Sequence, residues 1–367
     1  MEFIDLKAQY ARIEEKINQR ISNALSHGKH IMGPEVFELE EQLADFVGVK
    51  HAISCANGTD ALQLSLMALE IGQNDAVFCP TFTFFATAEV IALVGATPIF
   101  VDSDPKTFNM CPKDLLVKIK QVKAEGKLNL KAIIPVDLFG LPADFPNINK
   151  IAKEFNLHLI EDAAQGLGGE IEGKKAGSFG DIATTSFFPA KPLGCFGDGG
   201  MVFTDNDDFA GVIKSLRIHG KGQHKYDNVR IGLNSRLDTI QAAILLEKLA
   251  IFPDEIISRQ QVAKEYESFF GDKISTPAIP EGYKSAWAQY TLLTEDRAHW
   301  LSHFKDCNIP TAIYYEKCMH QQSVFQHLGV KDHQLPVASK LSQSVFSIPM
   351  HPYVNISSFK RAFIKNN

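Results

Sequence analysis

The sequence lacks several features that would assign it to a familiar class. Its 6 cysteines form no C-x-x-C pair and have no histidines at a ligand spacing, which argues against a disulfide framework or a zinc site. No apolar run is long enough to span a bilayer. No G-x-G-x-x-G motif follows an early strand, which disfavours a nicotinamide-binding oxidoreductase. We therefore expect no metal ion, no membrane span and no dinucleotide site.

Blocks of lysine or arginine are also missing. The 367 residues include 37 Lys and Arg against 43 Asp and Glu, which gives a formal net charge of -6 and a pI near 6.1. This mild acidity argues against nucleic acid or an anionic membrane as a partner and favours a small metabolite. Residues 1–7 are acidic where a secretory signal would be basic, so we expect a cytoplasmic protein.

Short apolar runs alternate with segments of helical periodicity between about residues 50 and 205. This alternation predicts an α/β fold, with a mostly parallel sheet covered by helices on both faces. Ligands of such folds bind at the carboxyl ends of the strands. The predicted strands are 76–79, 99–101, 133–136, 157–160, 184–188 and 201–204.

The last third of the chain has a different pattern. Helical spacing over 237–250 is followed by a second predicted helix that begins at Pro253, a favourable first position, and runs to about residue 269. Proline and glycine at 277–282 mark a loop. Strand-like runs at 289–293 and 311–315 flank a helix at 299–307. We predict a large domain, 1–250, and a small α+β domain, 251–367.

An aspartate at a strand end and a downstream lysine indicate a pyridoxal phosphate site. This cofactor needs a lysine amine to hold its aldehyde and a carboxylate to keep its pyridine nitrogen protonated. Asp162 and Lys191 have these groups. Taken alone, Asp162 could cap a helix and Lys191 could be a solvated surface group. The apolar segments 187–189 and 192–194 around Lys191 favour a desolvated amine with a lowered pKa.

A phosphate would need a separate cradle, and Gly58, Thr59 and Asp60 open a helix after a tight turn. Free N–H groups and the helix dipole favour an anion at such a start. The alternative is that Thr59 or Asp60 merely caps a structural helix. Ser186 is either an ordinary strand-end hydroxyl or a donor to the phosphate. The aromatic segment 80–85 follows a strand and could supply a ring that stacks on the pyridine.

Five ordered motifs resemble the DegT/StrS-type nucleotide-sugar aminotransferases, and the likeness extends from residues 3–6 to 349–352. The resemblance implies a fold-type-I pyridoxal phosphate enzyme that works as a homodimer with shared active sites. The motifs are N-G-T-D-A-L (57–62), P-T-F-T-F (80–84), E-D-A-A-Q (161–165), S-F-F-P-A-K (186–191) and G-L-N-S-R-L-D (232–238).

The same resemblance implies a role for individual residues. Lys191 would form the Schiff base, Asp162 would pair with the pyridinium nitrogen, and Gln165 would contact the ring hydroxyl. The remaining positions would hold the phosphate or stack on the ring, with Asn234 reaching the phosphate of the partner subunit's cofactor. They are Gly58, Thr59 and Ser186 for the phosphate, Asp60 as a further cofactor-binding residue and Phe84 for the stack.

Within the family, Lys191 favours transamination from L-glutamate, because the related sugar 3-dehydratases carry histidine at this position. The motif at 232–238 resembles enzymes that aminate C-3 of a keto sugar, especially UDP-2-acetamido-2-deoxy-3-oxo-glucuronate, for lipopolysaccharide or other glycan synthesis. Those enzymes have His-Tyr-Pro where this chain has Tyr314 and Tyr315 followed by Glu-Lys, in a loop expected to touch the sugar. Arg230 or Arg236 could bind a uronate carboxylate.

Other activities of the same fold remain alternatives. They include C-4 amination of a 4-keto-6-deoxy nucleotide sugar and a pyridoxal phosphate lyase. A desulfurase would also need a mobile nucleophilic cysteine. Cys195 is the nearest one, and we expect it to pack in the core. A binding protein that had borrowed the fold would be expected to lose Lys191 or Asp162, and both are present.

Overall fold

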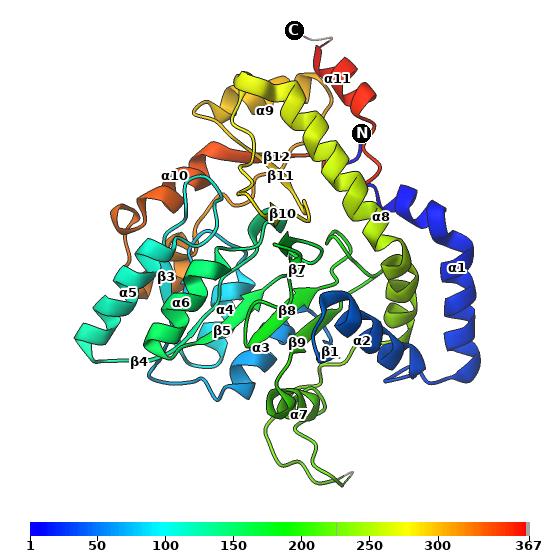
Figure 1. Cartoon of the computed structure of the whole chain (residues 1–367), viewed down its shortest axis with the longest axis vertical. Coiled ribbons are helices and arrows are strands. Elements are labelled where there is room, and N and C mark those ends of the chain that lie inside the picture. Colours follow the sequence, from blue (N-terminus) through cyan, green and yellow to red (C-terminus); the bar gives the residue numbers. More distant parts are fainter. Residues whose placement is uncertain (225, 365–367) are drawn as a thin grey trace.

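The computed structural model describes residues 1–224 and 226–364, and its centre is a seven-stranded sheet (Figure 1). Five strands are parallel to one another, and β1 also runs in their direction, because β9 is antiparallel to both β1 and β8. In spatial order the strands are β1 (His51–Cys55), β9 (Gly200–Thr204), β8 (Ile182–Ser186), β5 (His158–Asp162), β4 (Asn129–Ile133), β2 (Asp75–Pro80) and β3 (Thr97–Val101).

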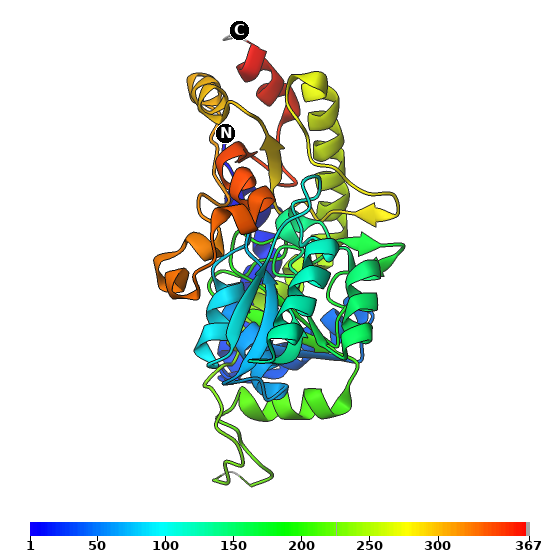
Figure 2. The same ribbon diagram turned by 90° about the vertical axis from the view of Figure 1, so that its left-hand side faces the viewer.

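Helices cover both faces of this sheet (Figure 2). Alternate strand residues point to opposite faces, so Ile53, Val77 and Ile160 pack on one side while Ala52 and Phe78 pack on the other. The first face carries α3 (Gly58–Ala68), α4 (Ala86–Leu93) and α7 (Asp207–Leu216). The second carries α2 (Pro34–Val47), α5 (Pro112–Glu125), α6 (Phe145–Phe155) and the first half of α8 (Thr239–Phe270).

The C-terminal part forms a second, aromatic-rich core. Tyr266, Phe270, Phe304, Phe359 and Phe363 are buried together, and their rings make mostly tilted or edge-on contacts. The elements around this core are the antiparallel pair β11 (Tyr290–Leu293) and β12 (Val345–Ile348), with α9 (Arg297–Asp306), α10 (Pro336–Ser344) and α11 (Ile356–Ile364) nearby. A small sheet of β6 (Glu170–Ile171), β7 (Lys174–Lys175) and β10 (Tyr283–Lys284) lies between the cores.

The predicted helix start at Pro253 is wrong, because Pro253 lies inside the single helix α8. Proline removes one backbone hydrogen bond of a helix. Buried side chains hold α8 together across that point, with Phe252 in the core under the sheet and Tyr266 in the aromatic core. The predicted division at residue 250 therefore falls within a continuous helix. The helix α1 (Leu6–His27) packs alongside α8 (Figure 1). The domain boundary stays a prediction.

Two strand predictions need correction. Segment 311–315 is not a strand: only Ala312 makes an isolated bridge, to Ser347, and the partner of β11 is β12. The predicted strand 133–136 lies mostly beyond β4, which ends at Ile133. The strand β1 and its pairing with β9 were not predicted. The parallel sheet with helices on both faces is confirmed.

The two cores meet closely at Gly140, which has φ +105°. A Cβ atom here would lie 2.6 Å from the backbone nitrogen of Trp287, and the Gly140 carbonyl accepts a hydrogen bond from the Ala286 N–H at 2.7 Å. Only glycine combines this φ with this approach. The segment before β11 is thereby attached to the loop after β4, next to Phe139.

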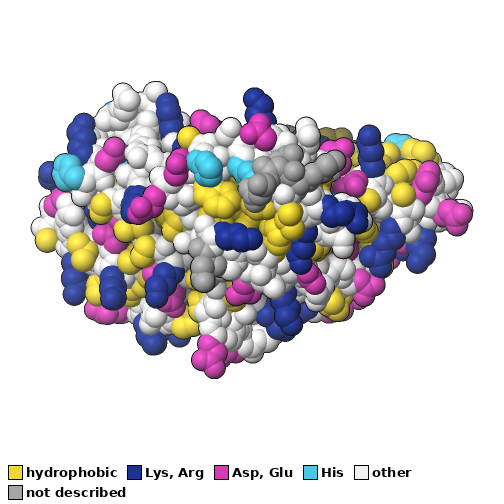
Figure 3. Space-filling view, turned by 90° about the horizontal axis from the view of Figure 1, so that it is seen from above, with side chains coloured by type: hydrophobic (Ala, Val, Ile, Leu, Met, Phe, Trp, Pro, Cys, Tyr) yellow, Lys and Arg dark blue, Asp and Glu magenta, His cyan; other side chains and the backbone are white. Residues whose placement is uncertain are grey.

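The surface at the end formed by α9 and α11 is mixed in character. Figure 3 shows Lys, Arg, Asp and Glu side chains of both signs interspersed over it, with hydrophobic side chains gathered near the middle. Among residues 1–224 and 226–364, no helix combines the length and the apolar character needed to cross a membrane.

Candidate active site

The site lies where β5 and β8 end side by side. The strands are parallel, and Asp162 pairs in register with Thr184, so the carboxyl end of β5 adjoins the loop that follows β8. Lys191 belongs to that loop. The fold thus brings together the two residues on which the cofactor prediction depends.

Both oxygens of Asp162 are hydrogen-bonded. Thr87 Oγ1 donates to Oδ2 at 3.0 Å, and the Ala164 N–H donates to Oδ1 at 3.2 Å. Asp162 is buried, and burial raises the pKa of its carboxyl, whereas these two hydrogen bonds and the positive charge of Lys191 lower it. The carboxylate is therefore fixed in orientation and has donors that favour its ionised form.

The loop that carries Lys191 is attached to the sheet and to α8. Its base is closed by the Phe187 N–H, which donates to the Gly199 carbonyl at 2.8 Å. Lys248 of α8 donates from Nζ to the Gly194 carbonyl at 2.7 Å, and burial lowers the pKa of Lys248 to about 8. Burial also lowers the pKa of Lys191, against the opposing effect of Asp162. A lowered pKa raises the share of neutral, nucleophilic amine.

The start of α3 lies against the end of β8. A Cβ at Gly58 would be 2.7 Å from the Ser186 Cβ, and a Cβ at Gly200 would be 2.3 Å from the Asn57 carbonyl oxygen. These glycines bring the helix start next to the Ser186 hydroxyl. The cap of α3 is Asn57, whose side chain accepts from the Asp60 N–H at 2.8 Å, so neither Thr59 nor Asp60 is the cap.

Anion-binding groups remain at this helix start. Within the described ranges, no hydrogen bond uses the N–H groups of Gly58 and Thr59. With the Ser186 hydroxyl they form a small cradle at the positive end of the helix dipole, which fits the phosphate of pyridoxal phosphate. The Asp60 N–H already donates to Asn57, so a direct role for Asp60 in cofactor binding stays a prediction.

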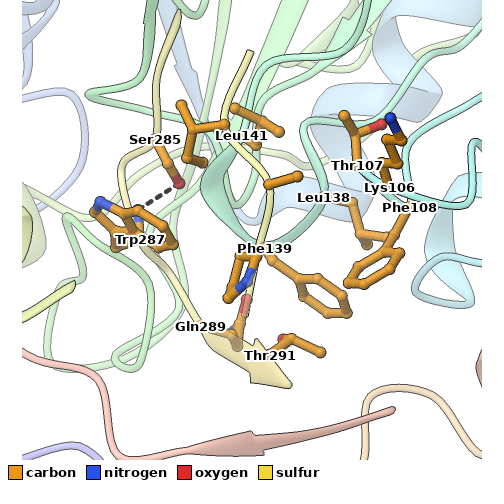
Figure 4. Close-up of a pocket in the computed structure, with 13 residues that line it drawn as sticks. Lys106, Thr107, Phe108, Leu138, Phe139, Leu141, Ser285, Trp287, Gln289 and Thr291 are labelled. Carbon is orange, nitrogen blue, oxygen red and sulfur yellow. Dashed lines mark hydrogen bonds between the residues drawn. The ribbon is translucent and has the colours of Figure 1, made fainter. Parts of the chain in front are cut away.

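Gln165 is held between two chain segments. Its Oε1 accepts from the Phe139 N–H at 2.9 Å, and its Nε2 donates to the Tyr315 hydroxyl at 3.3 Å. One proton of the amide nitrogen remains for a ring hydroxyl. The Phe139 side chain lines a small pocket with Leu138, Trp287 and others (Figure 4). The hydrogen bond from the Phe139 N–H to Oε1 therefore fixes the orientation of the Gln165 side chain.

Of the rings in segment 80–85, Phe84 and Phe82 have contrasting environments. Phe82 is fully buried and packs against Phe139 and Tyr315. Phe84 is 54% exposed, and its ring centroid is 6.3 Å from that of Tyr315. An exposed ring beside Gln165 and Tyr315 is the one free to stack on a cofactor. Tyr314 is next to Tyr315, with ring centroids 5.7 Å apart.

The three remaining predicted residues lie on segment 217–238. Ser235 accepts from the Ala56 N–H at 3.1 Å, which places Asn234 and the half-buried Arg236 near the end of β1. Arg230 lines a surface pocket with Met67 and other residues at the far end of α3 from Gly58. A helix of this length separates its two ends by about 15 Å. One chain therefore does not bring Arg230 to Lys191.

Two further acids lie directly behind Asp162. Glu161 accepts from the N–H groups of Gly177 at 2.6 Å and Phe179 at 2.7 Å, and its pKa is raised to about 7 by burial. Burial and the charge of Glu161 raise the pKa of Asp137 well above its ordinary value. These effects favour the protonated form of Asp137, whereas two backbone donors stabilise the charge of Glu161.

The DegT/DnrJ/EryC1/StrS aminotransferase family matches residues 11–362. The chain belongs to this family. It is 48% identical, over 98% of both chains, to the UDP-2-acetamido-2-deoxy-3-oxo-D-glucuronate aminotransferase of Pseudomonas aeruginosa. It is 41% identical to the UDP-N-acetyl-3-dehydro-alpha-D-glucosamine 3-aminotransferase of Acidithiobacillus ferrooxidans, covering 95% of this chain and 92% of the relative.

Comparison with solved structures supports the same family assignment. An aminotransferase of this family from Brucella abortus superposes with a TM-score of 0.97 at 49% identity, over 100% of this chain and 98% of that one. NtdA of Bacillus subtilis, solved with bound pyridoxamine phosphate, has a TM-score of 0.85 at 29% identity, over 96% of this chain and 81% of that one. The predicted fold-type-I architecture, the transaminase class and the pyridoxal phosphate cofactor are confirmed.

Several residues around the site were not predicted from the sequence. Thr87 lies in the first turn of α4, and Asp137 and Phe139 follow β4. They contact the site only through tertiary hydrogen bonds or charge. Lys248 lies on α8, far along the chain. The only local sequence signal was Asn57, because asparagine is a preferred helix cap and stands directly before Gly58.

The protonated state of Asp137 predicts a pH dependence of stability. Both folded-state pKa values are raised, so above about pH 4.5 these two groups bind more protons in the folded protein than in the unfolded one, and their contribution to stability falls as the pH rises. Asp137→Asn cannot ionise, and its amide oxygen can still accept from the Ala143 N–H. We expect the apoprotein variant to melt about 2–4 °C above wild type at pH 8, with the gap narrowing towards pH 4.

The control is Glu161→Gln, whose amide offers one acceptor oxygen to two backbone N–H groups. Calorimetry should show it destabilised at every pH, because one N–H loses its partner. The opposite pattern, with Asp137→Asn the damaging change at pH 8 and Glu161→Gln harmless, would show that the proton resides on Glu161.

Proposed function

We propose that this aminotransferase moves the amino group of L-glutamate to C-3 of a UDP-linked 2-acetamido-2-deoxy-3-oxo sugar, with the 3-oxo-glucuronate as the first candidate. The 48% identity to the Pseudomonas aeruginosa enzyme over nearly the whole chain supports this most strongly. The Acidithiobacillus ferrooxidans relative also acts at C-3, on a sugar without the C-6 carboxylate. Amination at C-3 is the feature that the names of both relatives share.

The chemistry divides between the cofactor and the chain. When bound, pyridoxal phosphate supplies an aldehyde that carries the amino group and a ring that accepts electrons. Asp162 would keep the ring nitrogen protonated, and the cradle of Gly58, Thr59 and Ser186 would hold the phosphate. The Lys191 amine would take a proton from the Cα of glutamate and later return one to C-3 of the sugar. The half-buried position of Lys191, close enough to Asp162 for the two charges to interact, supports this role.

A homodimer with shared active sites is part of the proposal. The loop that follows α7 projects away from the large sheet, with residues 226–231 exposed (Figures 1 and 2). Ile231 on it is 91% exposed and Val229 is 54% exposed, which is costly for a segment facing only water. If a second copy of the chain covered this segment, Asn234 and Arg230 of the first copy would lie near the active site of the second copy. Arg236 and the Tyr314–Tyr315 loop are proposed to contact the sugar.

The role in lipopolysaccharide or other glycan synthesis and the cytoplasmic location stay predictions. Amino sugars made at C-3 are building blocks for such polymers, which supports the first. The six cysteines are all free thiols, with five of them buried, which fits a reducing compartment.

The substrate proposal can be tested by turnover on four nucleotide sugars, 3-keto or 4-keto, each with and without a C-6 carboxylate. We expect the 3-keto sugars to exceed the 4-keto sugars in kcat/KM by at least about 100-fold, because a displaced keto carbon misses the Lys191 amine. L-glutamate alone should bleach the cofactor band of the wild type and not of Lys191→Ala. Faster turnover of a 4-keto sugar would support the C-4 alternative and reject the proposal.

The shared site can be tested by complementation. Asn234→Asp places a negative charge where the partner's cofactor phosphate is proposed to bind, so this variant and Lys191→Ala should each lose nearly all activity. A heterodimer purified through two different tags has one intact site, because Lys191 of one subunit meets Asn234 of the other. We expect about half of the wild-type turnover per dimer. An inactive heterodimer, or full activity of Asn234→Asp alone, would contradict a shared site.

A further inference from the structure

A hydroxyl that the chemistry above does not use touches Asp162. Thr87 Oγ1 donates to Asp162 Oδ2 at 3.0 Å, and the Thr87 side chain is only 1% exposed. The other carboxylate oxygen accepts from the Ala164 N–H at 3.2 Å. Water does not compete for this bond, so it is stronger than the same bond at a surface. Together the two donors fix the plane of the carboxylate.

Thr87 is itself held in one orientation by a second buried hydroxyl. Thr83 Oγ1 lies 3.3 Å from Thr87 Oγ1, and Thr83 is fully buried. A hydroxyl has one proton to donate. Because Thr87 gives its proton to Asp162, Thr83 must be the donor in the Thr83–Thr87 contact. The result is a directed chain from Thr83 through Thr87 to Asp162, in which each bond polarises the next.

The direction of this chain matters for the charge on Asp162. A buried carboxyl tends to take up a proton, and a neutral Asp162 could not keep a pyridine nitrogen protonated. The Thr87 hydroxyl acts in the opposite sense, since it stabilises the ionised form. Thr83 lies in the turn between β2 and α4, and Thr87 lies in the first turn of α4. This region therefore contributes to the site, although only a stacking ring was predicted from it.

We propose that Thr87, oriented by Thr83, is a positioning residue that keeps Asp162 ionised and aimed at the pyridine nitrogen of the cofactor. The proposal rests on the pyridoxal phosphate chemistry above. It assigns to Thr87 no contact with substrate. Its effect passes through Asp162 alone, so it should change the electronic state of the bound cofactor more than the affinity for either substrate.

The test compares Thr87→Val, which keeps the shape and removes the hydroxyl, with Thr87→Ser, which keeps the hydroxyl. Thr184→Val is the matched control, because Thr184 is also 1% exposed and its hydroxyl donates only to a backbone carbonyl, that of Glu161, at 3.2 Å. We expect Thr87→Val to raise the Kd for pyridoxal phosphate by about 10-fold or more, since a hydrogen bond to a charged group is lost.

A spectroscopic readout separates positioning from a merely structural role. In Thr87→Val the pH midpoint of the cofactor absorbance change should move upward, because a less protonated ring nitrogen repels the imine proton less. The kcat should fall by about 10-fold or more while KM for L-glutamate changes little. Thr87→Ser should restore both values. Thr87→Val and Thr184→Val should both melt at a lower temperature than wild type, because each loses a buried hydrogen bond. Thr184→Val should nevertheless keep the wild-type pH midpoint of the absorbance change and the wild-type Kd for pyridoxal phosphate.

Two results would overturn this inference. One is a Thr87→Val protein with the wild-type midpoint and Kd. The other is a Thr87→Ser protein as impaired as Thr87→Val, which would mean that the hydroxyl is not responsible. A wild-type protein that shows no cofactor band would instead refute the pyridoxal phosphate chemistry, so the two failures can be told apart.

Discussion

The site depends on two opposite charges that are withdrawn from water at adjoining strand ends. Burial disfavours the charged forms of both Asp162 and Lys191. The negative charge of Asp162 and the positive charge of Lys191 partly offset this effect, because each stabilises the charged form of the other. A carboxylate that stays ionised and an amine that gives up its proton readily are the two states that pyridoxal phosphate chemistry requires. The parallel pairing of β5 and β8 places them next to each other, since both strands end at the same edge of the sheet.

Much of the surrounding structure serves to hold these two groups in place. Thr87 and the Ala164 N–H fix the carboxylate, and Lys248 secures the loop that carries Lys191. Glycines 58 and 200 let the start of α3 reach Ser186, and Gly140 attaches the second core beside Phe139, which orients Gln165. Close backbone approach at a few glycines therefore brings together the residues of the candidate cofactor site.

The sequence predicted those parts of the site that depend on local order. Asp162 ends an apolar strand and Lys191 follows the next strand, so their positions could be inferred from periodicity alone, while the assignments of Gln165, Phe84 and Asn234 came from family motifs. The contacts of Thr87 and Lys248 depend on how distant segments pack, and no local pattern reports that. Pro253 misled because its local penalty is outweighed by burial along both halves of α8. Segment 311–315 has strand-like residues but forms only one bridge.

The central claim is that Lys191 forms the covalent bond to the cofactor, and chemical trapping tests it most directly. Protein loaded with pyridoxal phosphate would be reduced with borohydride, digested and mapped by mass spectrometry. We expect the phosphopyridoxyl label on the peptide that contains Lys191, and no label there after pretreatment with L-glutamate, which removes the aldehyde from the lysine. A label on another lysine, with Lys191 unmodified in fully loaded protein, would contradict the account.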